Sequence, residues 1–283
     1  MSGSRRRRGP GVVATDVVLT TVDGQRLTAW HLQVPDRAAA VVLVHGFTGS
    51  ARAPQVALTA EGLAAAGFDV VAVDTRGHGG STGRSTLGDL ERHDVDAAVR
   101  HAREHLDGPV VVVGASMGAI AALRHATSCA SADGLILLSC PARWDLPRTP
   151  SALAATLLTR TTPGRYLAQR WLGVRVASAW TKPPSPAELI GSVRHPVAIV
   201  HGEADRFIPP QAARDLHAAL EAAAGGDPGP RARLMLVPGM GHGFDERARD
   251  AIGEALAWVL DRAGALAAPG ADVPPSGPHR AAG

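Results

Sequence analysis

A serine stands between two glycines, directly after a run of four valines. The run at 110–113 leads into GASMG at 114–118, which fits the pattern G-x-S-x-G. In that pattern a sharp turn between a strand and a helix exposes the serine hydroxyl, and the glycines avoid collisions on either side of the turn. Such a hydroxyl attacks a carbonyl carbon when a neighbouring base removes its proton. The stretch therefore predicts that Ser116 is a nucleophile.

An acid and a histidine follow this serine at the ends of later apolar runs. The run at 197–200 leads into HGEAD, which contains Asp205, and the run at 234–237 leads into PGMGHG, which contains His242. A histidine serves as the base, and a carboxylate holds the histidine ring in place. Because parallel strands all end at one edge of a sheet, we expect Ser116, Asp205 and His242 to meet there. Glu203 is the nearest alternative to Asp205.

Two backbone N–H groups are predicted to bind the negative oxygen that forms when a hydroxyl attacks a carbonyl group. One belongs to Met117, which follows Ser116 at the start of a predicted helix. The other is expected in the loop HGFTGS at 45–50, which follows a predicted strand. We assign it to Phe47, because glycines on both sides of the Phe-Thr pair let this loop approach a substrate closely.

The elements that must position these residues alternate between strands and helices. Residues 12–19 and 27–34 predict a hairpin around VDGQ. Further strands are predicted at 39–44, 68–73, 110–113, 134–139, 196–200 and 233–237, and helices at 51–66, 87–106, 117–126, 210–224 and 245–263. Short apolar strands that alternate with helices predict an α/β fold, with a mostly parallel sheet covered by helices on both faces.

The alternation breaks at about residues 143–186, which are rich in proline and contain no clear strand. An insertion of this kind between two strands predicts a small cap on a single domain at 12–266. Residues 1–11 and 267–283 are predicted to be disordered tails. The cap holds three of the five tryptophans and several arginines. We interpret the arginines as a solvated face, and leave open an aromatic lining of an acyl pocket and a role in binding anionic substrates.

Composition excludes several classes of function. The net charge of +3 comes from the cluster RRRR at 5–8, and the rest of the chain is close to neutral, which gives no case for nucleic acid. No stretch is apolar for long enough to span a membrane, and the residues after the arginines do not form an export signal. Only Cys129 and Cys140 are present, too few for a disulfide scaffold. These features predict a cytoplasmic protein.

Five pieces of the sequence together resemble the α/β-hydrolase superfamily. They are HGFTGS at 45–50, DTRGHGGS at 74–81, GASMG at 114–118, GEADRFIP at 202–209 and GHGF at 241–244. They lie in the family's order within residues 12–265. The resemblance implies an eight-stranded, mostly parallel sheet, a catalytic triad of Ser116, Asp205 and His242, and no cofactor. HGFTGS and GEADRFIP are most similar to bacterial carboxylesterases and to monoacylglycerol-lipase-like or aminopeptidase-like serine hydrolases.

Other histidines and charged residues near the strand ends are expected to be structural. His45 and His201 also end strands, but no cysteine or carboxylate spacing typical of zinc accompanies them, and we predict no metal site there. In the family, the stretch DTRGHG, with Asp74, Arg76 and His78, fixes a loop. We suggest Asp94 as one of its partners.

The sequence therefore predicts a serine hydrolase that cleaves a small-molecule carboxylic ester or thioester. One alternative is an aminopeptidase-like amidase or an acyltransferase with the same triad. A peptidase needs an acid that binds the free amine, and Asp145 and Glu188 are the only acids in or near the cap. A second alternative is a non-catalytic binding protein with this fold. Acyl chain length, leaving group and oligomeric state stay open.

Overall fold

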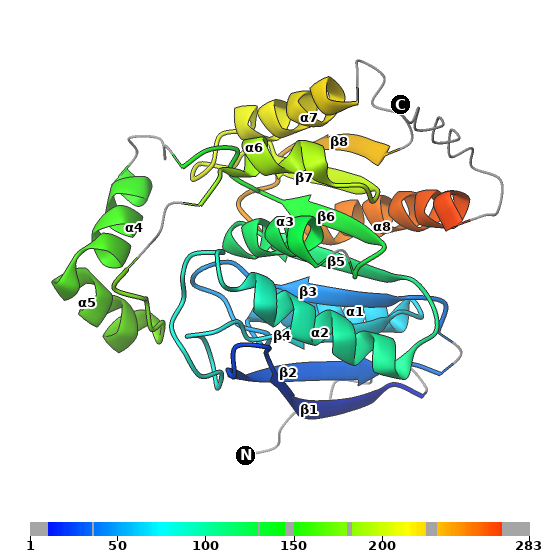
Figure 1. Cartoon of the computed structure of the whole chain (residues 1–283), viewed down its shortest axis with the longest axis horizontal. Helices are drawn as coiled ribbons and strands as arrows, with labels where there is room; N and C mark the ends of the chain where they lie inside the picture. The colour runs from blue at the N-terminus through cyan, green and yellow to red at the C-terminus, as the bar shows by residue number, and fades with distance from the viewer. Residues whose placement is uncertain are drawn as a thin grey trace, which may run out of the picture.

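The computed structural model describes residues 11–35, 37–129, 131–144, 150–179, 183–224 and 231–267 (Figure 1). The predictions of disordered tails therefore lie almost entirely outside the described residues. So do the cap residues Asp145, Arg148, Trp180 and Lys182.

Within the described residues, eight strands form one sheet in the order β1-β2-β4-β3-β5-β6-β7-β8. β1 and β2 form the predicted antiparallel hairpin, β2 pairs with β4 in antiparallel fashion, and all other pairs are parallel. The strands are β1 (Val13–Thr20), β2 (Arg26–Gln33), β3 (Ala40–Val44), β4 (Asp69–Val73), β5 (Val110–Ala115), β6 (Gly134–Leu138), β7 (Val197–Gly202) and β8 (Ala232–Val237). This is the predicted architecture.

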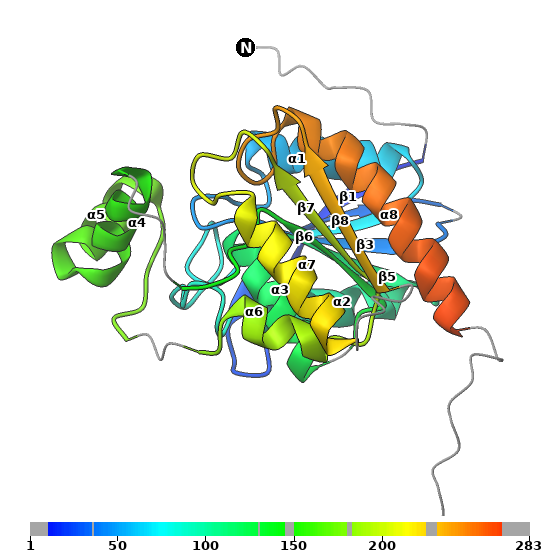
Figure 2. The same cartoon turned by 90° about the horizontal axis from the view of Figure 1, so that it is seen from above.

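Helices cover both faces of the sheet, as Figure 2 shows from above. On one face lie α2 (Arg92–His105), α3 (Met117–Ser128) and α7 (Gln211–Ala223), together with the short α6 (Pro186–Leu189) and the turn η1 (Ile190–Ser192). On the other lie α1 (Pro54–Ala65) and α8 (Glu246–Ala267). Strands β3 to β7 are buried along their whole length, which explains why they consist of continuous apolar runs, apart from Asp69 in β4 and His201 in β7.

The helix predicted at 87–106 begins later than expected. It starts at Arg92, and Leu87 before it has a positive φ of 60°. The carboxylate of Glu91 accepts hydrogen bonds from the N–H groups of Thr86 and Gly88, at 2.8 and 3.0 Å. These bonds satisfy the local backbone in a turn, so the apolar spacing of Leu87 and Leu90 does not continue the helix.

The cap contains two helices, α4 (Pro150–Arg160) and α5 (Thr162–Leu172), that stand beside the sheet (Figure 1). The side chain of Thr161 caps the start of α5, and Gly173 ends it in the left-handed conformation. The strand-like segment after α5 is bonded to the loop after β4. Ser85 N–H donates to the Arg175 carbonyl at 2.7 Å, and Arg175 N–H donates to the Gly77 carbonyl at 2.9 Å. The cap is thus anchored to the sheet domain.

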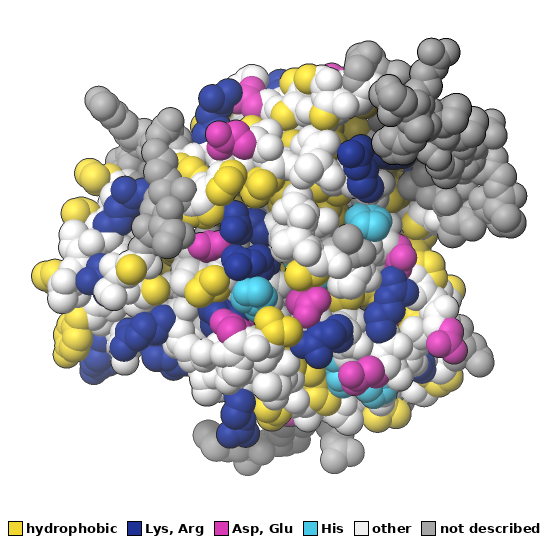
Figure 3. Space-filling view, in the orientation of Figure 1, with side chains coloured by type: hydrophobic (Ala, Val, Ile, Leu, Met, Phe, Trp, Pro, Cys, Tyr) yellow, Lys and Arg dark blue, Asp and Glu magenta, His cyan; other side chains and the backbone are white. Residues whose placement is uncertain are grey.

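The surface of the cap is mixed in character. Figure 3 shows hydrophobic and basic side chains side by side over α4 and α5. Its exposed apolar residues include Leu153, Leu157, Tyr166 and Trp171. No helix in the described part of the chain combines the length and the apolar character that a membrane span requires.

Candidate active site

Ser116 lies at a sharp turn between β5 and α3. Its backbone has φ 53° and ψ −112°, a strained conformation for a residue with a side chain. A Cβ on Gly114 would collide with the Gly118 carbonyl, and one on Gly118 would collide with the Val44 carbonyl. The two glycines of the motif are therefore required by backbone that passes on either side of the serine. The turn has the geometry that the sequence predicts.

Asp205 and His242 are in direct contact. Asp205 follows β7 and His242 follows β8, and His242 Nδ1 donates to Asp205 Oδ2 at 2.7 Å. The other carboxylate oxygen accepts the N–H groups of Phe207 and Ile208, at 2.8 and 2.9 Å. Burial raises the pKa of Asp205, but the bonds from His242 and the two N–H groups outweigh it, so the pKa lies below its ordinary value. Asp205 is thus held as a carboxylate, whereas Glu203 is exposed.

The loop that carries His242 is fixed by residues that the sequence analysis missed. Gly243 N–H donates to Ser139 Oγ at 3.0 Å, and Gly241 N–H donates to Asp245 Oδ2 at 2.6 Å. Ser139 follows β6 and has a positive φ of 47°. Asp245 also accepts the Ala248 N–H at 2.9 Å at the start of α8, so its position before a helix was the one available signal. Nothing in the sequence marks Ser139.

Ser116, Phe47 and Met117 line one cavity of about 360 Å³. Phe207, next to the Asp205 loop, also lines it, and the Phe207 ring lies 5.0 Å from the His242 ring. A Cβ on Gly243 would lie 3.8 Å from Cβ of Ala115, so the residues beside His242 and Ser116 approach one another. The remaining lining residues are Leu87, Ile120, Pro141, Arg143, Trp144, Ala155, Thr156, Thr159, Arg160 and Ile208.

The cap contributes part of the cavity lining, a point that the sequence left open. Trp144 lies in the lining, whereas Trp171 is 73% exposed. The basic residues Arg143 and Arg160 both line the cavity, whereas the other described cap arginines, Arg165, Arg170 and Arg175, do not. The lining is therefore mainly apolar, with positive charge on the side of the cap.

The two N–H groups predicted to bind an oxyanion belong to Phe47 and Met117, which both line the cavity. Among the backbone hydrogen bonds of the described residues, none is donated by Phe47 or by Met117. The carbonyl group of Phe47 accepts a hydrogen bond from His78 Nε2 at 2.6 Å, which fixes the loop. Thr75 Oγ1 lies 3.1 Å from His78 Nδ1 and holds that ring in turn. His78 thus fixes the loop that carries Phe47.

The charged residues that follow β4 hold their own loop in place through hydrogen bonds and ion pairs. Arg76 binds Asp94 through Nε at 2.9 Å and through Nη2 at 2.7 Å, which is the partner suggested from sequence, and Nη1 binds Asp23 at 2.7 Å. Asp74 accepts the Ala51 N–H at 2.6 Å. These residues build the loop and do not line the cavity.

His45 and His201 are both buried and both bonded to backbone. His45 Nδ1 donates to the Gly46 carbonyl at 2.8 Å, and its Nε2 accepts the Thr75 N–H at 3.2 Å. His201 Nε2 donates to the Ile208 carbonyl at 2.9 Å. Their contacts agree with the structural roles expected for them.

Acidification should lower the free energy of unfolding between pH 6.5 and about 4. Burial, together with the nearby His78, lowers the pKa of His45 from 6.5 to about 4. In this window the unfolded chain takes up a proton that the folded chain does not, so stability is highest above pH 6.5 and falls as the pH falls. Urea titrations at the two ends of the window measure the loss. In His45→Gln the slope should be smaller by up to about 1.4 kcal/mol per pH unit. Equal slopes in the two proteins would contradict the assignment of a neutral, buried His45.

Two protein-family models together match residues 35–263 of the chain. A family model described as serine aminopeptidase, S33, matches residues 35–183, and one described as the dienelactone hydrolase family matches residues 165–263. The uncharacterized protein YqkD of Bacillus subtilis is 25% identical over 203 residues, which are 69% of this chain. That match spans 64% of the length of YqkD, less than two thirds of the relative.

Solved structures with this fold include two esterases. The Pyrococcus furiosus esterase Pf2001 is 21% identical, with a TM-score of 0.70 over 92% of this chain and 96% of that one. The esterase RhEst1 from Rhodococcus sp. ECU1013 is 18% identical, with a TM-score of 0.64 over 87% of this chain and 99% of that one. At these identities the likeness shows that the chain has the α/β-hydrolase fold.

Proposed function

Because the chain belongs to the serine aminopeptidase S33 family of hydrolases, we propose that it cleaves a carboxylic ester or thioester through an acyl-enzyme intermediate. The observation that carries the proposal is the position of Ser116. Its strained turn opens into an apolar cavity that Phe47 and Met117 also line, and a bonded Asp205–His242 pair lies beside the cavity-lining Phe207.

In the first half of the reaction Ser116 Oγ attacks the carbonyl carbon of the substrate. Its proton moves to Nε2 of His242, whose Nδ1–H stays bonded to Asp205. The carbonyl oxygen becomes negative and accepts hydrogen bonds from the N–H groups of Phe47 and Met117. The carbon–oxygen or carbon–sulfur bond to the leaving group then breaks. His242 gives its proton to that group, and the acyl group stays on Ser116.

In the second half, water takes the place of the leaving group. His242 accepts a proton from water, the resulting hydroxide attacks the acyl carbon, and the bond to Ser116 Oγ breaks as the serine regains its proton from His242. The enzyme returns to its starting state, and the products are a carboxylic acid and an alcohol or thiol.

The charges around the cavity favour an ester over the free N-terminus of a peptide. Among the described residues that line the cavity, none is acidic, and Arg143 and Arg160 would repel an ammonium group. Glu188, the described acid nearest in sequence to the cap, accepts the Ser185 N–H at 2.7 Å in a capping box. Neutral or negatively charged acyl groups fit this lining better than aminoacyl groups.

The match to the dienelactone hydrolase family covers the segment with Asp205 and His242 and does not reach the nucleophile. This chain has Ser116 at the elbow, where dienelactone chemistry would want a cysteine. An alkoxide-forming serine needs the base more than a thiol does, because its own pKa is far higher. The oriented Asp205–His242 pair therefore fits serine chemistry.

A fluorophosphonate probe and a matched substrate panel test the proposed function. We expect one covalent label on Ser116, and turnover of p-nitrophenyl acyl esters and acyl thioesters but not of aminoacyl p-nitroanilides. Faster turnover of the anilides would favour the aminopeptidase alternative. A chain that is neither labelled nor active on the panel would be a binding protein with this fold. We keep the cytoplasmic location as a prediction.

A further inference from the structure

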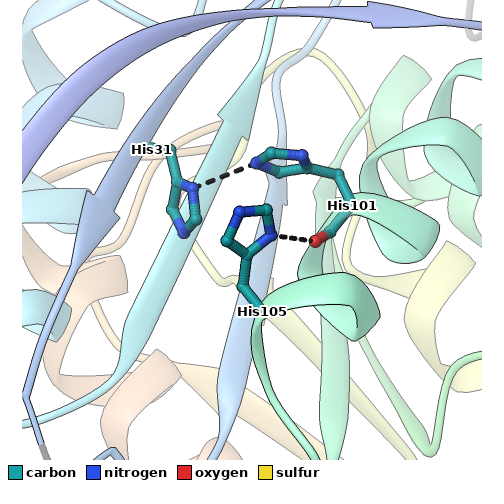
Figure 4. Close-up of side chains that lie close together, drawn as sticks. All are labelled: His31, His101 and His105. Carbon is teal, nitrogen blue, oxygen red and sulfur yellow. Dashed lines mark hydrogen bonds between the residues drawn. The ribbon is translucent and has the colours of Figure 1, made fainter.

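Three histidine side chains lie close together (Figure 4). His31 comes from β2, and His101 and His105 come from α2, one turn apart. Their ring centroids are 4.9 Å apart for His31–His101, 5.2 Å for His31–His105 and 4.4 Å for His101–His105. Each ring offers one nitrogen, and the three nitrogens lie within 4.8 Å of one another.

This histidine cluster lies near the N-terminal ends of the parallel strands, whereas Ser116 lies at a C-terminal end. His31 bonds to Asp69, the first residue of the parallel strand β4, and His105 ends α2, just before the chain enters β5. Ser116, by contrast, follows the last residue of β5. The cluster is therefore separate from the proposed catalytic site.

Two of the rings are held so that a lone pair faces the cluster. His31 Nε2 donates to the buried carboxylate of Asp69 at 3.0 Å, and His105 Nδ1 donates to the His101 carbonyl at 2.8 Å. A neutral imidazole carries one N–H, so Nδ1 of His31 and Nε2 of His105 are acceptors. Carboxylates and carbonyl groups hold metal-binding imidazoles in the same way. Asp69 itself is fixed by the Val34 N–H at 3.2 Å.

We propose that His31, His101 and His105 bind a divalent transition-metal ion, and that Zn²⁺ suits them best. Three imidazoles and a water molecule form a common tetrahedral zinc site. His31 Nδ1 and His101 Nε2 are 3.0 Å apart, close to the separation of about 3.3 Å that two nitrogens have on a tetrahedral zinc ion. To bind, His101 moves its proton from Nε2 to Nδ1, and the ring stays neutral.

The cluster is open to solvent on one side. His31 is buried, whereas His101 and His105 are half-buried. A shallow hollow of about 470 Å³, lined by Arg37, His105, Leu106, Asp107 and Gly108, gives access to His105. Arg37 Nε lies 3.7 Å from the Asp69 carboxylate, so the negative charge of Asp69 offsets the positive charge of Arg37. A bound ion would link the N-terminal hairpin to α2.

A second group in the described residues could compete for the ion. Asp96, His125 and Cys129 also place three ligand atoms within 4.8 Å. Two of them are already engaged, because His125 Nε2 lies 2.9 Å from Ser131 Oγ and Asp96 accepts a hydrogen bond from Arg100 at 3.0 Å. We therefore favour the histidine cluster, and the cysteine makes the two sites distinguishable by spectroscopy.

Calorimetric titration of the EDTA-treated full chain with ZnCl₂, without an affinity tag, tests the proposal. Wild type should bind one Zn²⁺ per chain, and the ion should raise the melting temperature. His105→Gln should bind it at least about tenfold more weakly, a loss expected when a ligand is removed. His217→Gln is the matched control, because His217 lies on α7 and pairs with Glu221 at 3.4 Å, outside the cluster. It should bind as wild type does.

Co²⁺ added to the wild-type chain gives a readout that does not depend on the folding of a variant. The expected spectrum has the visible bands of a tetrahedral nitrogen site, unchanged in Cys129→Ser. A thiolate-to-cobalt band that Cys129→Ser removes would place the ion at the competing group and overturn the proposal. Equal affinities of wild type and His105→Gln would overturn it as well, as would wild type that binds no stoichiometric metal.

Discussion

Replacing Ser116 with alanine should lower kcat/KM on a p-nitrophenyl acyl ester by about 10⁴- to 10⁶-fold. The alanine keeps the turn between β5 and α3 but has no oxygen to form the acyl-enzyme. The N–H groups of Phe47 and Met117 stay in place, so a small residual rate above that of water is expected. Steady-state rates and fluorophosphonate labelling measure the loss together.

Ser128→Ala is the matched control for this variant. Ser128 lies at the end of the same helix and is exposed. Its hydroxyl donates to the Arg124 carbonyl at 2.7 Å and lies 3.7 Å from Cys129 Sγ. We expect this variant to keep the wild-type rate and the label. If Ser116→Ala kept more than a tenth of the wild-type activity, Ser116 would not be the nucleophile.

Replacing Asp205 with asparagine should lower kcat by about 10³- to 10⁴-fold and leave KM almost unchanged. The amide can donate a hydrogen bond to Nδ1 of His242, and it would then hold the proton of the ring on Nε2, where the base must be free. The substrate-binding surface keeps its shape, so the loss falls on turnover. The measurement is a full Michaelis curve for the variant and for wild type.

Glu203→Gln is the matched control for Asp205→Asn. Glu203 is the exposed acid two residues before Asp205, and it was the alternative orienting group from sequence. It should keep full activity. If Glu203→Gln lost activity while Asp205→Asn kept it, the roles of these two acids would have to be exchanged.

The sheet and the elbow could be predicted from sequence because their causes are local. Buried parallel strands need apolar residues on both faces, and the runs AVVLV at 40–44 and VVVV at 110–113 supply them. The elbow depends on two glycines within five residues. The prediction that helix α2 begins at residue 87 was wrong. The Glu91 carboxylate accepts hydrogen bonds from backbone N–H groups before the helix, and so α2 begins only at Arg92.

The supports of the site were not predictable, because they depend on contacts between distant parts of the chain. Ser139 holds a loop 104 positions further on, and Asp23 reaches Arg76 across 53 positions. Two members of the histidine cluster could have been paired from the sequence, because His101 and His105 in HAREH have helical spacing. Its third member, His31, lies 70 positions before His101, and only the folded chain brings the two rings together.

The cap lines the cavity with Arg143 and Trp144 and with a short stretch of α4. Among the described side chains of α4, Ala155, Thr156, Thr159 and Arg160 line the cavity, and none of them belongs to the proposed triad. If the proposed function holds, these α4 side chains shape the acyl pocket, whereas Ser116, Asp205 and His242 carry out the chemistry. Recombining this helix pair with those of relatives, or randomising these four positions, should redirect the acyl preference while the reaction itself is inherited intact.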